Sequence, residues 1–164
     1  MNEVKSAIFA GGCFWGMEDL FRKLDGVIDT EVGYTGGDNT DPTYQSHPGH
    51  AEALKIIYDP NLIGYQGLLD FFFCIHNPTT RNQQGNDMGS AYRSAIFFSN
   101  DDEKTLSEEF IDLVNKSGKW QHPVVTTLEP LAVFYVAEDY HQDYLEKNPG
   151  GYTCHFIRHD SYIK

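Results

Sequence analysis

The chain has 164 residues, of which 40% are hydrophobic and 22% charged, so we expect one domain over residues 1–164 with a sizeable core. Its 24 acidic residues outnumber the 12 basic ones, and the net charge of −12 argues against binding to nucleic acid or to an anionic membrane. No apolar run approaches the ~20 residues of a membrane span, and none near the N-terminus suits a signal peptide, which predicts a cytoplasmic protein.

The cysteine and histidine spacing argues against a structural disulfide framework or a metal site. Cys13, Cys74 and Cys154 are an odd number of widely spaced thiols, without a CxxC pair. His47 and His50 lie close together, but a third ligand at useful spacing is missing, so we expect no metal. In a reducing compartment, a cysteine that matters is then expected to be catalytic or redox-active.

Hydrophobic periodicity predicts an interspersed series of strands and helices. In the first half of the chain we expect a strand at 5–10, a helix through Met17 and Leu24 that ends near Gly26, a strand at 27–34, a long loop at 35–49, a strand at 53–58 and a helix from Tyr65 through Phe73. In the second half we expect a polar loop at 77–90, a strand at 93–98, a helix from Asp101, strands at 124–128 and 131–136, and a helix at 138–147. In the helix from Asp101, the residues expected to face inward are Leu106, Phe110, Leu113 and Val114. Because helices and strands do not alternate strictly, the series favours an α+β domain with a mixed or antiparallel sheet.

Cys13 lies in the stretch "GGCFWGMEDL", between a predicted strand and the start of a predicted helix. Free backbone N–H groups and the helix dipole stabilise a thiolate there, so we expect its pKa to lie below the usual value of about 8.5. Gly11, Gly12 and Gly16 are expected to let a substrate approach the sulfur closely. The alternative is that Cys13 only fills core volume, as many cysteines do.

Several further side chains have the chemistry of a site, each with a simpler structural interpretation. Phe14 and Trp15 belong to the core or wall a pocket for an apolar group such as a methyl. Glu52 lies among apolar residues, where burial would raise its pKa and make it a proton donor, or it faces solvent on an edge strand. Asp87 and Tyr92 lie in a polar loop that either presents hydrogen-bond donors or is merely solvated.

The two remaining cysteines have different surroundings. Cys74 lies in the apolar stretch "FFFCI", which is typical of core packing. Cys154 lies in "GGYTCHF", after two glycines that let its segment move. A second thiol on such a segment is what a cysteine sulfenic acid needs to form a disulfide, although the pattern leaves open whether Cys154 meets Cys13.

Longer motifs cover almost the whole chain: "GGCFWGMEDLF", "VGYTGG", "PTY", "GHAEAL", "LLDFFF", "HNPTTRNQQGNDMGSAYRSAIFF" and "AEDYHQDYLEKNPGGYTCHFIR". In these motifs the chain closely resembles the peptide methionine sulfoxide reductases of type A. The resemblance implies an α+β fold with a ferredoxin-like mixed-sheet core, surrounded by helices and long loops. It also implies a cofactor-free enzyme, which we expect to be a monomer, that reduces methionine S-sulfoxide, free and in oxidised proteins, and is recycled by thioredoxin. Its role would be protein repair after oxidative damage.

Carried over by position, the resemblance assigns the chemistry to three residues: Cys13 as nucleophile, Glu52 as general acid and Cys154 as resolving cysteine. The substrate-binding residues that it implies are Phe14, Trp15, Tyr44, Asp87 and Tyr92. The stretch "QSHPGHAE", which separates Tyr44 from Glu52, is shorter than in many members of the family. Because Cys154 is the only cysteine near the C-terminus, thioredoxin is expected to attack the first disulfide directly.

Two other functions use the same cysteine. A thiol peroxidase would attack peroxide with Cys13, but peroxide does not need an apolar pocket beside Phe14 and Trp15. A redox-sensing or methionine-binding module would use the pocket without turnover.

Overall fold

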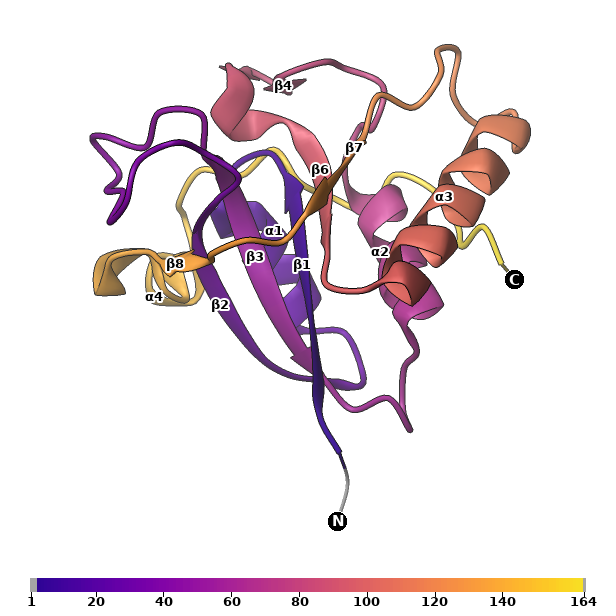
Figure 1. The fold of residues 1–164 in the computed structure, drawn as a ribbon, viewed down its shortest axis with the longest axis horizontal. Helices are drawn as coiled ribbons and strands as arrows, with labels where there is room; N and C mark the ends of the chain where they lie inside the picture. The colour runs from indigo at the N-terminus through magenta and orange to yellow at the C-terminus, as the bar shows by residue number, and fades with distance from the viewer. Residues whose placement is uncertain (1–2, 164) are drawn as a thin grey trace.

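The structure is a computed structural model that describes residues 3–163, and six of its strands form one mixed sheet in the order β7-β6-β1-β3-β2-β8 (Figure 1). These strands are β1 (Lys5–Gly11), β2 (Val27–Thr35), β3 (Ala51–Tyr58), β6 (Ser94–Phe98), β7 (Thr127–Pro130) and β8 (Tyr135–Val136). Neighbouring strands are antiparallel except β6 and β7, which are parallel. A separate short hairpin pairs β4 (Gln83–Gln84) with β5 (Asp87–Met88).

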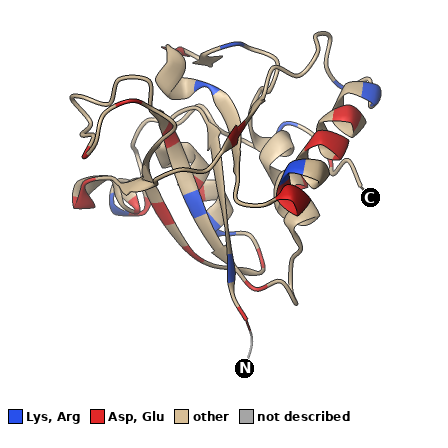
Figure 2. Ribbon diagram, in the orientation of Figure 1, with Lys and Arg blue, Asp and Glu red and all other residues tan. Residues whose placement is uncertain are grey.

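The helices occupy the connections between these strands. They are α1 (Phe14–Arg22), α2 (Tyr65–Ile75), α3 (Asp101–Lys116), α4 (Tyr144–Lys147) and the 3-10 helices η1 (Ser90–Tyr92) and η2 (Asp139–His141). The α+β class with a mixed sheet is confirmed, whereas the ferredoxin-like description of its core stays a prediction. Acidic residues are frequent along α3, and basic residues are spread over several elements (Figure 2). Within residues 3–163, no helix is both long enough and apolar enough to cross a membrane.

Alternation along the strands sends side chains to two different cores. In β1, Ala7 and Phe9 belong to the larger core beneath α1 and α2, and Ile8 and Ala10 belong to a smaller core on the opposite face. The connection from β7 to β8 crosses that opposite face in Figure 1 and covers it with apolar side chains, namely Leu131 and Phe134. Both faces of the sheet are therefore buried at its centre, which agrees with the run of buried residues from Ala7 to Gly11 in β1.

The last third of the chain departs most from the predicted elements. The helix expected at 138–147 is divided into η2 and α4, because Asp143 adopts a left-handed backbone conformation with φ of 53°. In the strand expected at 131–136 only Tyr135–Val136 pairs, since residues 131–134 serve as the cover of the sheet. Leu113, expected to face inward from α3, is 39% exposed.

Candidate active site

Cys13 is the N-cap residue of α1, directly after the turn that ends β1. Gly12 makes this turn with a φ of 102°, a conformation that strongly favours glycine. The cysteine itself has φ −56° and ψ 126°, and its side chain makes no capping hydrogen bond. The thiol therefore lies at the start of the helix, as the strand-to-helix pattern predicts.

The pKa predicted for the Cys13 thiol is wrong in direction. Cys13 is only 7% exposed, and burial, followed by the charge of Glu52, raises its pKa well above the usual value. The nearby backbone N–H of Trp15 acts to lower the pKa, as expected of a helix start, but this effect is smaller than the loss of hydration. The Cys13 thiol is thus neutral at neutral pH.

Glu52 lies inside β3 and points toward α1, because alternation places it on the same face as Leu54 and Ile56. Its Oε1 accepts a hydrogen bond from the backbone N–H of Phe14 at 3.2 Å. The side chain is 1% exposed, and burial raises its pKa to about 8, although the bond from Phe14 acts in the opposite direction. At neutral pH the Glu52 carboxyl group is therefore protonated. It lies beside Phe14, the residue that follows Cys13.

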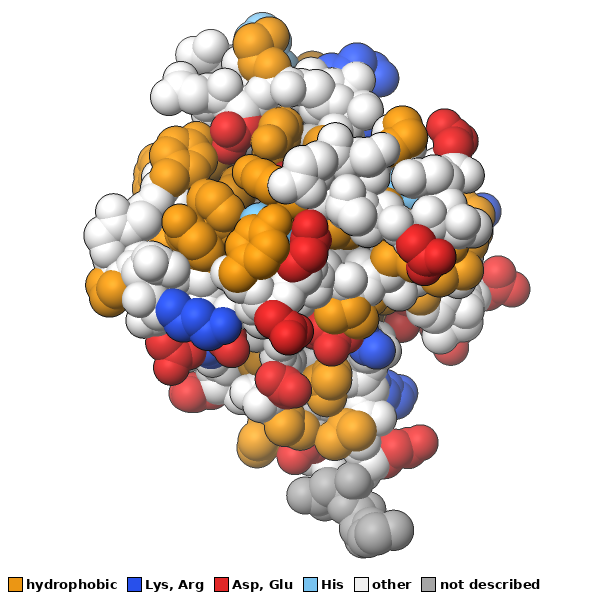
Figure 3. All heavy atoms as spheres, turned by 90° about the vertical axis from the view of Figure 1, so that its left-hand side faces the viewer, with side chains coloured by type: hydrophobic (Ala, Val, Ile, Leu, Met, Phe, Trp, Pro, Cys, Tyr) orange, Lys and Arg blue, Asp and Glu red, His pale blue; other side chains and the backbone are white. Residues whose placement is uncertain are grey.

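An aromatic wall continues from the start of α1. Trp15 donates from Nε1 to Nδ1 of His141 at 3.0 Å, and its ring stacks on Tyr144 with the centroids 3.8 Å apart. Phe14 is fully buried, and its ring centroid lies 5.1 Å from that of His141. The ring centroid of Tyr44, which is 37% exposed, lies 4.5 Å from that of His141 and 6.4 Å from that of Trp15. Figure 3 shows apolar side chains gathered beside acidic ones on the side of the molecule that carries α4.

Glu138 holds the Tyr44 loop against the sheet. Its Oε1 accepts from the Tyr34 hydroxyl at 3.0 Å, and its Oε2 accepts from the backbone N–H of Tyr44, also at 3.0 Å. These bonds lower the pKa of Glu138, which is therefore a carboxylate at neutral pH. The short stretch between Tyr44 and Glu52 thus still allows the Tyr44 ring to lie against the aromatic wall, near Trp15 and His141.

Tyr92 and Asp87 complete the group around the thiol. Burial raises the pKa of Tyr92, and the charges of Glu52 and Asp87 raise it further, as they also do for Cys13. Asp87 accepts a hydrogen bond from the Tyr152 hydroxyl at 3.1 Å, which ties it to the C-terminal segment. The tyrosine hydroxyl groups are consequently protonated and able to donate.

The C-terminal segment brings Cys154 to the same region. All three cysteines are reduced, and Cys154 is partly exposed. Its Sγ lies 3.9 Å from Gln84 O, and the next residue, His155, lies 2.7 Å from the carbonyl oxygen of Gly11, two residues before Cys13. Cys74 instead lies buried in α2, with its Sγ 3.6 Å from Asp160 O.

The residues predicted for the site therefore gather around the start of α1: Cys13, Phe14, Trp15, Tyr44, Glu52, Asp87, Tyr92 and Cys154. Residues 5–162 match the family model described as peptide methionine sulfoxide reductase. The chain belongs to the peptide methionine sulfoxide reductase family.

Named members of this family resemble the chain over nearly its whole length. It is 58% identical over 160 residues to the peptide methionine sulfoxide reductase MsrA of Mycobacterium sp. (strain JLS), covering 98% of the chain and 94% of the relative. The reduced form of Mxr1 from Saccharomyces cerevisiae superimposes with a TM-score of 0.84 at 38% identity, over 96% of this chain and 93% of that one. Mxr1 in complex with Trx2 gives a TM-score of 0.62 at 29% identity, over 96% and 91% of the two chains.

Two residues of this reductase site, His141 and Tyr144, are not among the site residues that the sequence predicts. They lie in the segment expected to be one plain helix, and their contacts to Trp15 span more than a hundred residues of chain. Both residues lie in the motif "AEDYHQDYLEKNP", whose local pattern predicts only a helix.

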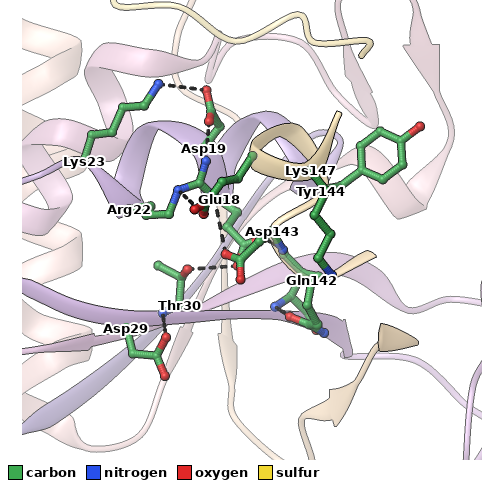
Figure 4. Close-up of polar contacts among 12 residues, drawn as sticks. Glu18, Asp19, Arg22, Lys23, Asp29, Thr30, Gln142, Asp143, Tyr144 and Lys147 are labelled. Atoms are coloured by element: carbon green, nitrogen blue, oxygen red, sulfur yellow. Dashed lines mark hydrogen bonds and ion pairs between the residues drawn. The ribbon is translucent and has the colours of Figure 1, made fainter. Parts of the chain in front are cut away.

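A buried carboxylate network fastens this part of the reductase to α1 (Figure 4). Glu18 accepts from the backbone N–H of Asp143 at 2.7 Å and from the Thr30 hydroxyl at 2.8 Å. Gln142 bonds both the N–H and the carbonyl of Val32 at 2.9 Å. The aromatic wall is therefore held by polar bonds that lie behind it.

In the part of the chain that the structure describes, no group of three or more His, Cys, Asp or Glu side chains is arranged to hold a metal ion. His50, weighed as a metal ligand, uses both ring nitrogens inside its loop. Nδ1 accepts from Gly37 N at 3.0 Å, and Nε2 lies 2.9 Å from Asn39 O. His47 is half-buried, and its Nδ1 lies 2.8 Å from Thr43 O.

Proposed function

We propose that this chain reduces methionine S-sulfoxide, free and in proteins, to methionine, with Cys13 as nucleophile and thioredoxin as final reductant. Relatives named peptide methionine sulfoxide reductase support the reaction, and the complex of Mxr1 with Trx2 supports the reductant. The observation that carries the proposal is a protonated, buried Glu52 beside the Cys13 thiol.

In the first step, Glu52 gives its proton to the sulfoxide oxygen while Cys13 Sγ attacks the sulfoxide sulfur. A sulfoxide oxygen is a poor leaving group until it is protonated, so a general acid is expected to contribute about 10²–10⁴-fold. The thiol proton of Cys13 restores the proton of Glu52. The products are methionine and a Cys13 sulfenic acid, and the oxygen atom has moved from one sulfur to the other.

The pocket determines which sulfoxide reacts. Tyr44 and Tyr92 are protonated donors that would hold the sulfoxide oxygen on the side of Glu52. Trp15, packed next to the fully buried Phe14, offers apolar surface to the methyl group on the other side. With oxygen and methyl directed to opposite walls, one configuration at sulfur presents its back to Cys13, which we take to be the S epimer.

In the second step, the thiol of Cys154 attacks the Cys13 sulfenic acid. The new S–S bond replaces the S–O bond, and hydroxide leaves with the thiol proton as water. Thioredoxin then reduces this disulfide. We propose that the protein works as a monomer in the cytoplasm, where thioredoxin is available, and needs no other cofactor.

Steady-state turnover with dithiothreitol tests the proposed function. We expect turnover of methionine S-sulfoxide but little consumption of hydrogen peroxide, and no turnover by Cys13→Ser. Faster turnover of peroxide than of the sulfoxide would instead identify a thiol peroxidase. Binding of methionine without turnover would identify a binding module.

A further inference from the structure

His155 follows Cys154 directly and is buried beneath the turn that carries Cys13. Its Nε2 lies 2.7 Å from the carbonyl oxygen of Gly11, the last residue of β1. A carbonyl oxygen can only accept, so Nε2 carries the ring proton and Nδ1 has a free lone pair. Burial lowers the pKa of His155 to about 4, which keeps the ring neutral in ordinary assay conditions.

Gly16 of α1 makes room for this contact. A Cβ atom there would collide with His155 Nδ1 and with Thr153 Oγ1, whereas one at Gly12 would collide with the Gln84 side chain and would lie 3.3 Å from His155 Nε2. The sequence suggested that these glycines let a substrate approach the sulfur. The structure fills the space beside Gly16 with the C-terminal segment of the chain itself and the space beside Gly12 chiefly with Gln84.

Other side-chain bonds of the segment run to Asp87 and to the end of α2, and not to the β1–α1 turn. Arg158 donates to Ile75 O at 2.8 Å and to Cys154 O at 3.2 Å, which fastens the segment to the end of α2. The Cys154 thiol lies 3.9 Å from Gln84 O and 3.9 Å from His155 Nδ1, which are long contacts. Among the side chains described next to Cys154, His155 is thus the one bonded to the backbone of the β1–α1 turn.

We propose that His155 is a positioning residue for the second step, holding Cys154 beside Cys13 through its hydrogen bond to Gly11 O. The inference rests on the proposed function, because it concerns the attack of the Cys154 thiol on the Cys13 sulfenic acid. His155 touches neither the sulfoxide nor Glu52, so its loss affects formation of the disulfide and leaves reduction of the sulfoxide intact. The step needs no further oxidant, since the sulfoxide has already oxidised Cys13.

Single-turnover kinetics on the full chain separate the two steps. Methionine release reports the first step, and loss of free thiols together with dimedone trapping of Cys13 reports the second. In His155→Ala we expect methionine release within about threefold of wild type and disulfide formation about tenfold slower, the size expected when one hydrogen bond is removed. Dimedone labelling of Cys13 should rise in parallel.

Two amide variants distinguish positioning from a general effect on the fold. Gln at position 155 places its amide nitrogen close to the position of Nε2 and can still donate to Gly11 O, whereas the shorter Asn cannot reach it. We expect His155→Gln to form the disulfide within about threefold of wild type and His155→Asn to be as slow as His155→Ala. His159→Ala, on the same segment but packed on Trp120, is the matched control and should behave as wild type.

Wild-type disulfide formation in His155→Ala would overturn the inference, and so would a His155→Gln enzyme as slow as the alanine variant. A parallel loss of both steps would show that His155 only supports the fold. Failure of the proposed function is a separate outcome, because wild-type enzyme would then release no methionine at all.

Discussion

Replacing Glu52 by glutamine is expected to stabilise the protein while it removes the proposed acid. The carboxyl group is 1% exposed and its pKa is raised from the usual 4.5 to about 8, chiefly by burial. Because the pKa in the folded state is the higher one, the contribution of this group to stability is fully present below pH 4.5. It is lost as the pH rises through 8, since only the unfolded chain releases this proton easily.

The size of the effect follows from these two pKa values. Between pH 5 and pH 9, linkage predicts that Glu52 lowers the free energy of unfolding by roughly 4 kcal/mol. Glutamine does not ionise, and its Oε1 still accepts the hydrogen bond that Phe14 N makes to Glu52. Glu52→Gln should therefore match wild type near pH 5 and be more stable by several kcal/mol at pH 9, in order of magnitude.

Urea unfolding of both proteins at pH 5 and at pH 9 measures this difference. Every other titrating group is present in both proteins. A change with pH in the difference between their free energies of unfolding therefore reports the ionisation of Glu52. The same variant should lose about 10²–10⁴-fold in the rate of methionine release. If this difference in free energy of unfolding is the same at pH 5 and pH 9, Glu52 is already ionised in the folded protein. Glu52 could then not be the proton donor.

Three further substitutions test the site. Cys13→Ser should abolish methionine release and leave the urea midpoint near wild type, and residual turnover above a few per cent would exclude Cys13 as nucleophile. Cys154→Ser should release one equivalent of methionine in a single turnover but fail to cycle with thioredoxin; peptide mapping of oxidised wild type should find Cys13 joined to Cys154, and a bond to Cys74 would contradict the assignment. Trp15→Ala should raise KM strongly, because it removes an apolar wall of the pocket. It also removes the 3.0 Å hydrogen bond from Trp15 Nε1 to His141 Nδ1. Equal turnover of much larger sulfoxides by wild type would exclude a pocket shaped for a methyl group.

The sequence by itself determined the features that depend on neighbours along the chain. Alternating and helical periodicities predicted β1, α1, β2 and most of α2, and the glycines around Cys13 predicted a strand-to-helix turn. The motifs identified the family, which the comparisons confirm. Such patterns are local, because side-chain direction in a strand or helix depends on spacing of a few residues.

Only the tertiary structure decided the properties that depend on distant residues. The bond from Trp15 to His141 spans 126 residues and that from His155 to Gly11 spans 144, so no local pattern could pair them. Burial also reversed the expected pKa of Cys13, because the helix start stabilises a thiolate only to the extent that water or donors remain nearby. The glycines beside the thiol were visible in the sequence, but only the packed chain shows that Gly16 accommodates His155, the residue next to Cys154.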